Sequence, residues 1–198
     1  VATQMGNQGT ASSNMRRTAA QIKAGALGTC SEIHCWTNRP VWPQGVERPV
    51  ETPAVPAHVH WEGFIGPAPL RPYHPAYHPF SWRGWWDFGT GALGDMACHT
   101  LNLAFMALDL RDPVSVEATT PGHNNETFPG RSVIKYRFPE RNGRPPLTLT
   151  WYDGGERPSA ELLEGISEIS SSGLLVVGEK GKMYSPSDYG SESVWLPE

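Results

Sequence analysis

Two residues whose side chains can transfer protons, Asp95 and His99, stand four positions apart. In a helix this spacing places both side chains on one face. A carboxylate beside an imidazole can hold the ring in one tautomer and bring its pKa towards neutrality. Such a pair can accept a hydroxyl proton while a hydride leaves the same carbon. The spacing also fits a structural role, because an acidic residue in a first helical turn is electrostatically favourable.

Tryptophans gather just ahead of this pair, and six of the eight in the chain fall between Trp36 and Trp86. Indole rings pack well against the apolar faces of a sugar ring. We therefore expect Trp36, Trp85 and Trp86 to contact a carbohydrate substrate. His78 is expected to bind its hydroxyl groups, with Arg83 available for the same purpose.

The elements that must position these residues follow from periodicity. Residues 92–108 and 12–24 carry apolar side chains at helical spacing, with Ser12 or Ser13 to cap the second helix and Gly25 to end it. Strands are expected at residues 1–5, 30–36, 114–118, 132–138, 147–151 and 174–177. The strands at 132–138 and 147–151 follow one another across a turn and can pair as a hairpin. This order predicts an α+β fold with a large, mainly antiparallel or mixed sheet flanked by helices.

A proline-rich segment lies between the strand at 30–36 and the helix at 92–108. Ten prolines occur from Pro40 to Pro79, which excludes long stretches of regular structure. The same segment carries Trp42, Trp61 and Phe64, whose burial would offset the cost of ordering it. We expect an ordered, aromatic-rich and functional loop laid over the domain.

Two further patterns suggest sites that the context does not support. Gly89, Gly91 and Gly94 match G-x-G-x-x-G, but no buried β-branched strand precedes them as in a dinucleotide-binding loop. We interpret these glycines as allowing the backbone to approach a ligand closely. His58 and His60 alternate as strand ligands do, and Asp95 could join them, but without a defined third ligand no metal is expected.

Composition limits the partners and the architecture. The 198 residues fit one substantial domain. Sixteen Lys and Arg against 20 Asp and Glu, with no basic cluster, make nucleic acid and membrane surfaces unexpected partners. Three cysteines without C-x-x-C spacing do not predict a disulfide framework or a zinc site. No leader sequence is visible, which leaves a cytoplasmic and a periplasmic location both open.

The run from Gly84 to His99, GWWDFGTGALGDMACH, strongly resembles the glycine-rich D-x-x-x-H segment of the Gfo/Idh/MocA oxidoreductases (glucose–fructose oxidoreductase, inositol dehydrogenase and MocA). Supporting matches occur at residues 5–9, 25–28, 61–67, 151–155 and 178–181. The resemblance covers nearly all of the chain. It points to the bacterial branch that carries tryptophan-rich and proline-rich loops.

This resemblance implies an enzyme of two domains, of which the chain holds the second. Residues 1–9 would be the last strand of a Rossmann domain that is otherwise missing. Residues 10–198 would form the C-terminal domain for substrate binding and oligomerisation, with a C-terminus that could itself be incomplete. The open face of its sheet would join subunits into a homodimer or homotetramer.

The resemblance also assigns roles to particular residues. His99 would be the acid–base that transfers the proton, and Asp95 the residue that orients it. Trp82 and Arg83 match the Trp–Arg pair that contacts the nicotinamide cofactor, and Asn7 is expected at the cofactor as well. NAD or NADP would be bound mainly by the missing domain, because the chain has neither the Glu-Lys-Pro segment of the family nor a nucleotide loop.

Together these features predict the substrate side of an NAD(P)-dependent oxidoreductase for a sugar, cyclitol or glycoside hydroxyl, inactive without its Rossmann domain. One alternative is an NAD-dependent glycosidase of the same family, which oxidises its substrate transiently and eliminates the aglycone. Asp95 and His99 fit both, since both reactions need a base near the oxidised carbon. Another alternative is a carbohydrate-binding or oligomerisation module without catalysis.

Overall fold

Helices and strands form largely where apolar periodicity predicts them. A computed structural model of the protein describes residues 1–196. The helical segments are η1 (Gln8–Ala11), α1 (Ser13–Lys23), α2 (Trp61–Ile65), η2 (Ser81–Gly84), α3 (Gly91–Thr100) and α4 (Asn102–Leu108). The strands are β1 (Cys30–Trp36), β2 (Ser115–Thr119), β3 (Ser132–Phe138), β4 (Leu147–Asp153), β5 (Gly173–Gly178), β6 (Gly181–Ser185) and β7 (Val194–Leu196). The predicted helix at 12–24 is confirmed, with the hydroxyl of Ser12 accepting from the Met15 amide.

The strands form one seven-stranded sheet in the order β2-β3-β4-β1-β5-β6-β7. Only β1 and β4 run parallel among the pairs of the described chain, and every other pair is antiparallel. The predicted hairpin of β3 and β4 is confirmed, with Phe138 opposite Leu147 at its closed end. The expected α+β fold with a mixed, mainly antiparallel sheet is therefore correct.

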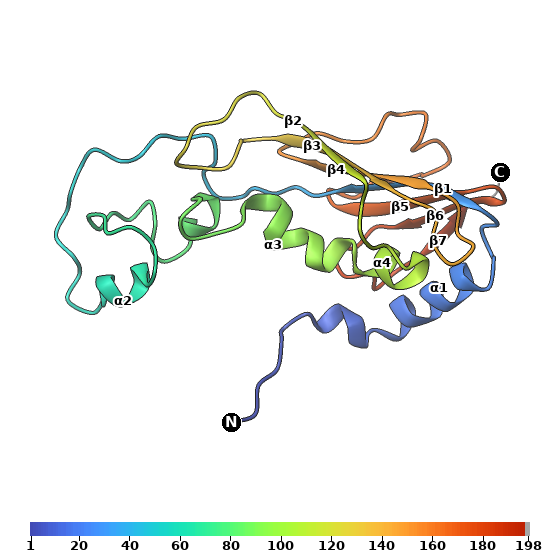
Figure 1. Cartoon of the computed structure of the whole chain (residues 1–198), viewed down its shortest axis with the longest axis horizontal. Helices are drawn as coiled ribbons and strands as arrows, with labels where there is room; N and C mark the ends of the chain where they lie inside the picture. The colour runs from blue at the N-terminus through green and yellow to red at the C-terminus, as the bar shows by residue number, and fades with distance from the viewer. Residues whose placement is uncertain (197–198) are drawn as a thin grey trace.

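The three longer helices, α1, α3 and α4, lie on one face of this sheet (Figure 1). Side chains alternate along β1, so that Ile33 and Cys35 enter the core beneath these helices, together with Trp151 of β4. Trp36 points to the opposite face and stacks on Tyr184 with 5.8 Å between ring centroids. The helix-covered face thus carries the main core and the segment with Asp95 and His99.

Two predicted elements differ from the structure. The helix expected at 92–108 is divided at Leu101 into α3 and α4. The Thr100 hydroxyl donates to the Met96 carbonyl at 3.1 Å, and a back-bond of this kind bends a helix. The strand expected at 1–5 is not formed, because no segment among the described residues lies alongside it to share backbone hydrogen bonds, and it extends away from the sheet (Figure 1).

The strands β6 and β7 were not predicted. Both are short and lack a run of alternating apolar residues, so they form as strands only by pairing in turn with β5 and β6. The expectation of an incomplete C-terminus concerns Pro197 and Glu198, which lie outside the described residues.

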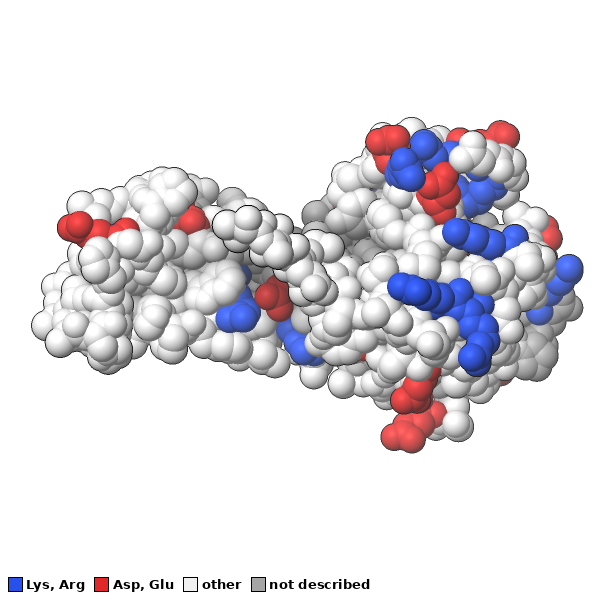
Figure 2. Space-filling model, turned by 90° about the horizontal axis from the view of Figure 1, so that it is seen from below, with Lys and Arg blue, Asp and Glu red and all other residues white. Residues whose placement is uncertain are grey.

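The proline-rich segment is ordered but does not lie over the sheet. It forms a lobe that projects from one end of the molecule and contains α2 (Figure 1). Its own apolar cluster has Trp61, Ile65, Tyr77 and Trp85 at its centre. From below, the lobe is separated from the main body by a narrower waist and shows a few acidic residues on its outer part, whereas charged residues of both signs are spread over the body (Figure 2).

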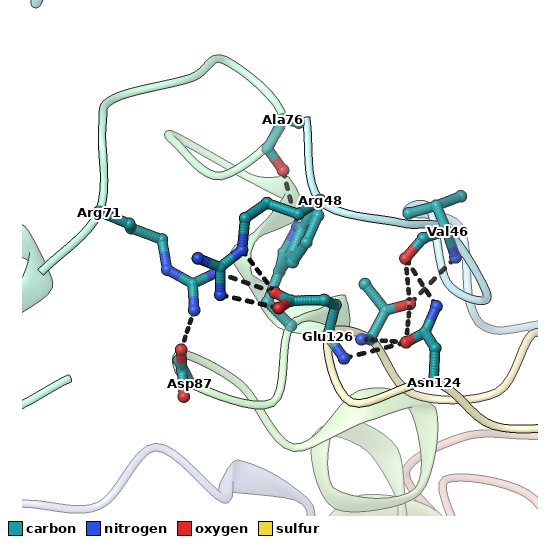
Figure 3. Close-up of polar contacts among 9 residues, drawn as sticks. Val46, Arg48, Arg71, Ala76, Asp87, Asn124 and Glu126 are labelled. Carbon is teal, nitrogen blue, oxygen red and sulfur yellow. Dashed lines mark hydrogen bonds and ion pairs between the residues drawn. The ribbon is translucent and has the colours of Figure 1, made fainter. Parts of the chain in front are cut away.

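Ion pairs and hydrogen bonds fasten this lobe to the loop between β2 and β3. Arg71, whose side chain is 3% exposed, pairs with Asp87 and lies 3.5 Å from Glu126. Glu126 in turn accepts two hydrogen bonds from Arg48, at 2.7 and 3.0 Å (Figure 3). Asn124 lies nearby and donates to the Val46 carbonyl at 3.0 Å. The lobe is therefore held by side-chain contacts to residues 55 and 78 positions away.

Within residues 1–196 no helix is both long and apolar enough to cross a bilayer.

Candidate active site

The helix α3 carries Asp95 and His99, and its start is fixed by an unusual cap. The N-cap residue Thr90 makes no side-chain hydrogen bond to the helix. The free amide of Ala92 donates instead to the Gln44 side chain at 3.1 Å. Gln44 also donates to the Pro129 carbonyl at 2.6 Å, so it joins the helix start to the β2–β3 loop.

The glycines before and within α3 are required by packing against protein. A side chain at Gly89 would collide with the backbone of Arg83. Gly91 has φ +61° and lies against the ring of Phe128, which leaves no room for a Cβ atom. These protein contacts account for Gly89 and Gly91, so a ligand is not needed to explain them, and a close approach of this backbone to a ligand remains a prediction. The close neighbours are Arg83 and Phe128.

Asn7 determines the orientation and the tautomer of His99. The Asn7 amide nitrogen donates to the Cys98 carbonyl at 2.8 Å, which directs its Oδ1 towards His99 Nδ1 at 2.9 Å. An amide oxygen can only accept, so Nδ1 of His99 carries the proton and donates. Nε2 is then the unprotonated nitrogen, and no partner for it occurs in the described part of the chain. A lone pair at Nε2 can accept a proton.

Tyr189 supports the other side of the same imidazole. Its ring meets that of His99 edge-on, with 5.2 Å between centroids and 67° between planes. Tyr189 lies in the loop after β6, so His99 is held between the N-terminal segment and the C-terminal part of the chain. No local pattern signals this contact, because 90 positions separate the two residues.

Asp95 does not contact His99 directly. In the described chain no hydrogen bond joins the two, although both lie on α3 at the predicted spacing and both are partly exposed. The Asp95 carboxylate pairs with Nε of Arg83 at 3.3 Å, where each side chain is 28% exposed. Asn7, which was expected at the cofactor, takes the position beside the imidazole that was predicted for Asp95.

Trp82 and Arg83 form a stacked pair beside Asp95. The guanidinium carbon of Arg83 lies 4.6 Å from the Trp82 ring centroid and 4.8 Å from that of Phe80. Arg83 also donates to the Phe80 carbonyl at 3.1 Å. The half-buried Trp82 ring thus stacks on a guanidinium that is already engaged with Phe80 and Asp95. A contact of Trp82 and Arg83 with the cofactor remains a prediction.

The four residues predicted to bind substrate divide into two groups. Trp36 is 0% exposed and donates to the Ser170 carbonyl, and Trp85 is 1% exposed and donates to Ala76. A substrate role for these two is wrong, because both rings are core side chains with satisfied indole nitrogens. Trp86 is 44% exposed, and His78 is partly exposed against Phe64. These two remain predictions.

The metal alternative has no support in the local structure. His58 and His60 are exposed residues of a turn and the segment before α2, so they do not alternate along a strand. Residues 1–196 contain no group of three or more His, Cys, Asp or Glu side chains placed to hold a metal ion.

Comparison with known families decides the assignment. The family model described as "Oxidoreductase family, C-terminal alpha/beta domain", that of the Gfo/Idh/MocA proteins, matches residues 21–143, more than half of the chain. The chain belongs to this oxidoreductase family. No curated protein matches the chain in sequence.

Solved structures share the fold of this oxidoreductase-family domain. The WlbA dehydrogenase from Chromobacterium violaceum, in complex with NADH and UDP-GlcNAcA, has 13% identity and a TM-score of 0.54 over 97% of this chain and 43% of its own. WlbA from Bordetella pertussis, with the same ligands, has 16% identity and a TM-score of 0.51 over 96% and 46%. A super-repressor mutant of Gal80p from Saccharomyces cerevisiae has 15% identity and a TM-score of 0.53 over 100% and 46%. The chain thus spans less than half the length of these proteins.

Proposed function

We propose that this domain is the substrate side of an NAD(P)-dependent oxidoreductase that acts on a hydroxyl group of a sugar, cyclitol or glycoside. The observation that carries the proposal is the contact of His99 with Asn7. It leaves Nε2 of a partly exposed imidazole as a proton acceptor on the helix face that also carries Asp95. A dehydrogenase needs such an acceptor next to the carbon that loses hydride.

The proposed reaction oxidises the hydroxyl-bearing carbon to a carbonyl, with the proton leaving the oxygen and a hydride leaving the carbon. Nε2 of His99 takes the hydroxyl proton, while Asn7 continues to accept from Nδ1 and holds the ring in place. Asp95 lies one helical turn away, and its negative charge favours the resulting imidazolium without a direct contact. Arg83 keeps the Asp95 carboxylate in position. NAD or NADP, when bound, accepts the hydride.

Trp86 and His78 are the side chains of the tryptophan-rich region that remain open to a substrate. An exposed indole suits the apolar face of a sugar ring, and an imidazole suits its hydroxyl groups. Trp82 would lie against the nicotinamide, next to the Arg83–Asp95 pair. The WlbA structures contain NADH and UDP-GlcNAcA, which supports the choice of cofactors and substrates to test.

The test uses the longer protein that the proposal implies, in which a Rossmann domain is joined to this one. Glucose, myo-inositol, UDP-GlcNAcA and a nitrophenyl glucoside are each offered with NAD or NADP, and formation of the reduced cofactor is followed by absorbance. For any substrate that is oxidised, His99→Ala should lower kcat by at least ~100-fold, the range for loss of a general base. His58→Ala, which alters an exposed histidine elsewhere in the chain, is the control and should leave kcat unchanged. Near wild-type turnover of His99→Ala would remove His99 from the mechanism.

Other outcomes of the same assay identify the alternatives. Release of nitrophenol without net accumulation of NADH would indicate an NAD-dependent glycosidase instead of a dehydrogenase. Binding of a sugar, seen as a change in tryptophan fluorescence, without turnover of any substrate would favour a non-catalytic carbohydrate-binding module.

A further inference from the structure

The loop between β6 and β7, residues 186–193, brings a free hydroxyl group to the proposed acid–base. Tyr189 of this loop meets the His99 imidazole by its ring edge, with 5.2 Å between centroids, and is 37% exposed. The tyrosine hydroxyl makes no hydrogen bond to any residue from 1 to 196. Tyrosine hydroxyls that are withdrawn from water ordinarily find a partner. This unpaired hydroxyl is therefore available to a ligand bound beside His99.

The residue before Tyr189 fixes the loop to the end of β1. Oδ2 of Asp188 accepts from Nη1 of Arg39 at 3.1 Å, and the two side chains are only 17% and 24% exposed. Arg39 lies three positions after the last residue of β1. A partly buried ion pair thus joins the loop to the central strand of the sheet.

The residues after Tyr189 are fixed from another side, by α1. Nδ2 of Asn14 donates to the Gly190 carbonyl at 3.1 Å and to the Ser193 hydroxyl at 3.0 Å. Gly190 has φ +62°, and a side chain there would also meet Met15. The backbone turn that follows Tyr189 therefore requires glycine.

The loop also packs against the N-terminal segment that holds Asn7. A Cβ atom at Gly9 would lie 3.1 Å from the Tyr189 carbonyl oxygen, so the two backbones are in close contact. Asn7 lies two positions earlier and accepts from Nδ1 of His99. Asn7 and Tyr189 thus reach one imidazole from two segments that touch each other. Contacts on several sides hold the tyrosine at the imidazole before a ligand binds, which lowers the entropic cost of using it.

We propose that Tyr189 is a substrate-binding residue whose hydroxyl group binds the substrate hydroxyl next to the one that His99 deprotonates. The proposal rests on the proposed function, since it takes Nε2 of His99 as the proton acceptor. A tyrosine hydroxyl both donates and accepts, as a sugar hydroxyl does. Within residues 1–196 no hydrogen bond joins this hydroxyl to the imidazole, so each group is free to bind its own oxygen. The substrate class is therefore a ring with two neighbouring hydroxyl groups, which sugars and cyclitols offer and simple alcohols lack.

Tyr189→Phe in the longer protein tests this contact, because it keeps the ring on His99 and removes only the oxygen. For any substrate that is oxidised, KM should rise about 5-fold, as expected for the loss of one neutral hydrogen bond. The value of kcat should change by less than ~2-fold, because the contact is made equally in the ground state and the transition state. Tyr73→Phe removes the hydroxyl of a half-buried tyrosine that packs on Trp61 in the lobe, and as the control it should change neither constant.

Monodeoxy analogues of the same substrate identify the hydroxyl that Tyr189 binds. The analogue that lacks the neighbouring hydroxyl should have the same KM with Tyr189→Phe as with the unaltered enzyme. Analogues that lack a more distant hydroxyl should still show the rise of about 5-fold.

A binding measurement on the 198-residue protein does not require turnover. Glucose, myo-inositol and UDP-GlcNAcA are each titrated into protein with isotope-labelled tyrosine and histidine rings, and NMR spectra are recorded. The Tyr189 signal is identified by its absence from the spectrum of Tyr189→Phe. At least one of the three ligands should shift the Tyr189 and His99 signals together, with a single dissociation constant.

An unchanged KM of Tyr189→Phe for an oxidised substrate would overturn the proposal, as would an equal rise in KM for every monodeoxy analogue. A Tyr189 signal that none of the three ligands shifts would overturn it as well. The proposed function has its own criterion, the turnover of His99→Ala. A loss of turnover in His99→Ala beside an unchanged KM in Tyr189→Phe would leave that function in place and reject only the role of Tyr189.

Discussion

The sheet and the aromatic lobe are stabilised in different ways. In the sheet, aliphatic side chains alternate into one core and backbone hydrogen bonds run along seven strands. In the lobe, α2 and η2 are short, and aromatic rings together with the Arg71 ion pairs hold irregular backbone. Stability in the sheet is spread over many contacts. In the lobe it depends on a few side chains.

This difference matters because the lobe borders the candidate active site. It supplies Arg83 to Asp95, and it carries the exposed ring of Trp86, which remains a predicted substrate contact. The acid–base residues themselves lie on α3, which is packed on the sheet. A change in the lobe should therefore alter ligand contacts while leaving the fold of the sheet intact.

Replacement of a buried tryptophan in each region should give the largest effects. Trp151→Ala in β4 should destabilise the whole domain by about 3–5 kcal/mol, because it removes a ring at the centre of the main core. Trp85→Ala should loosen the lobe alone, since its cluster is separate from that of the sheet. Hydrogen exchange resolved by segment measures both. Equal loss of protection in sheet and lobe for Trp85→Ala would show that the two regions unfold together.

The Arg71 ion pairs should give a smaller, local effect. Arg71→Met removes hydrogen bonds to two carboxylates from a buried position and should cost the lobe about 2 kcal/mol. Arg48→Met is the matched control, because it affects the same Glu126 from a side chain that is 48% exposed. It should cost less than about 1 kcal/mol. Protease sensitivity of residues 37–80 reports the change. A larger increase in protease sensitivity for Arg48→Met than for Arg71→Met would contradict the claim that burial makes the Arg71 ion pairs the stronger ones.

The smallest effect concerns the dependence of sheet stability on pH. Burial lowers the pKa of His34 below its usual 6.5, against a hydrogen bond from its ring to Glu32 that raises it. Below pH 6.5 the unfolded chain therefore takes up a proton more readily than the folded one, and the free energy of unfolding falls as pH decreases. This loss of stability is complete once the pH is below the pKa of His34 in the folded protein.

His34→Gln should flatten this dependence in denaturant titrations between neutral and mildly acidic pH. Tyr152, whose hydroxyl lies 3.1 Å from His34, and the nearby Lys135 are unchanged in that variant. An unaltered slope in His34→Gln would assign the pH dependence to other groups.

The sequence predicted the sheet far better than the lobe. Alternation and a serine cap are local signals, and they located β1, β3 and α1 correctly. The path of the lobe depends on pairs such as Arg71 with Glu126, 55 positions apart, which no local pattern encodes. Composition likewise could not separate Trp85, a core ring, from Trp86, an exposed one.

The candidate site was predicted only in part, because its contacts also join residues that lie far apart in the sequence. The spacing of Asp95 and His99 correctly implied a shared helix, but the partner of each residue came from elsewhere in the chain. Asn7 lies 92 positions from His99, so its contact with the imidazole could only be found in the folded structure. Likewise, the reason for glycine at positions 89 and 91 is seen only in the fold, where these residues pack against Arg83 and Phe128.

The most direct test of the account is the pH profile of kcat/KM for Asn7→Asp in the full-length protein. A carboxylate beside Nδ1 of His99 stabilises the imidazolium, so the acidic limb of the profile should move to higher pH by about 1 unit or more. His99→Gln should abolish that limb, whereas the control Asn38→Asp, at an exposed asparagine after β1 whose side-chain oxygen accepts, should leave it in place. A profile of Asn7→Asp identical to that of the unaltered enzyme would contradict the assignment of His99 as the acid–base held by Asn7.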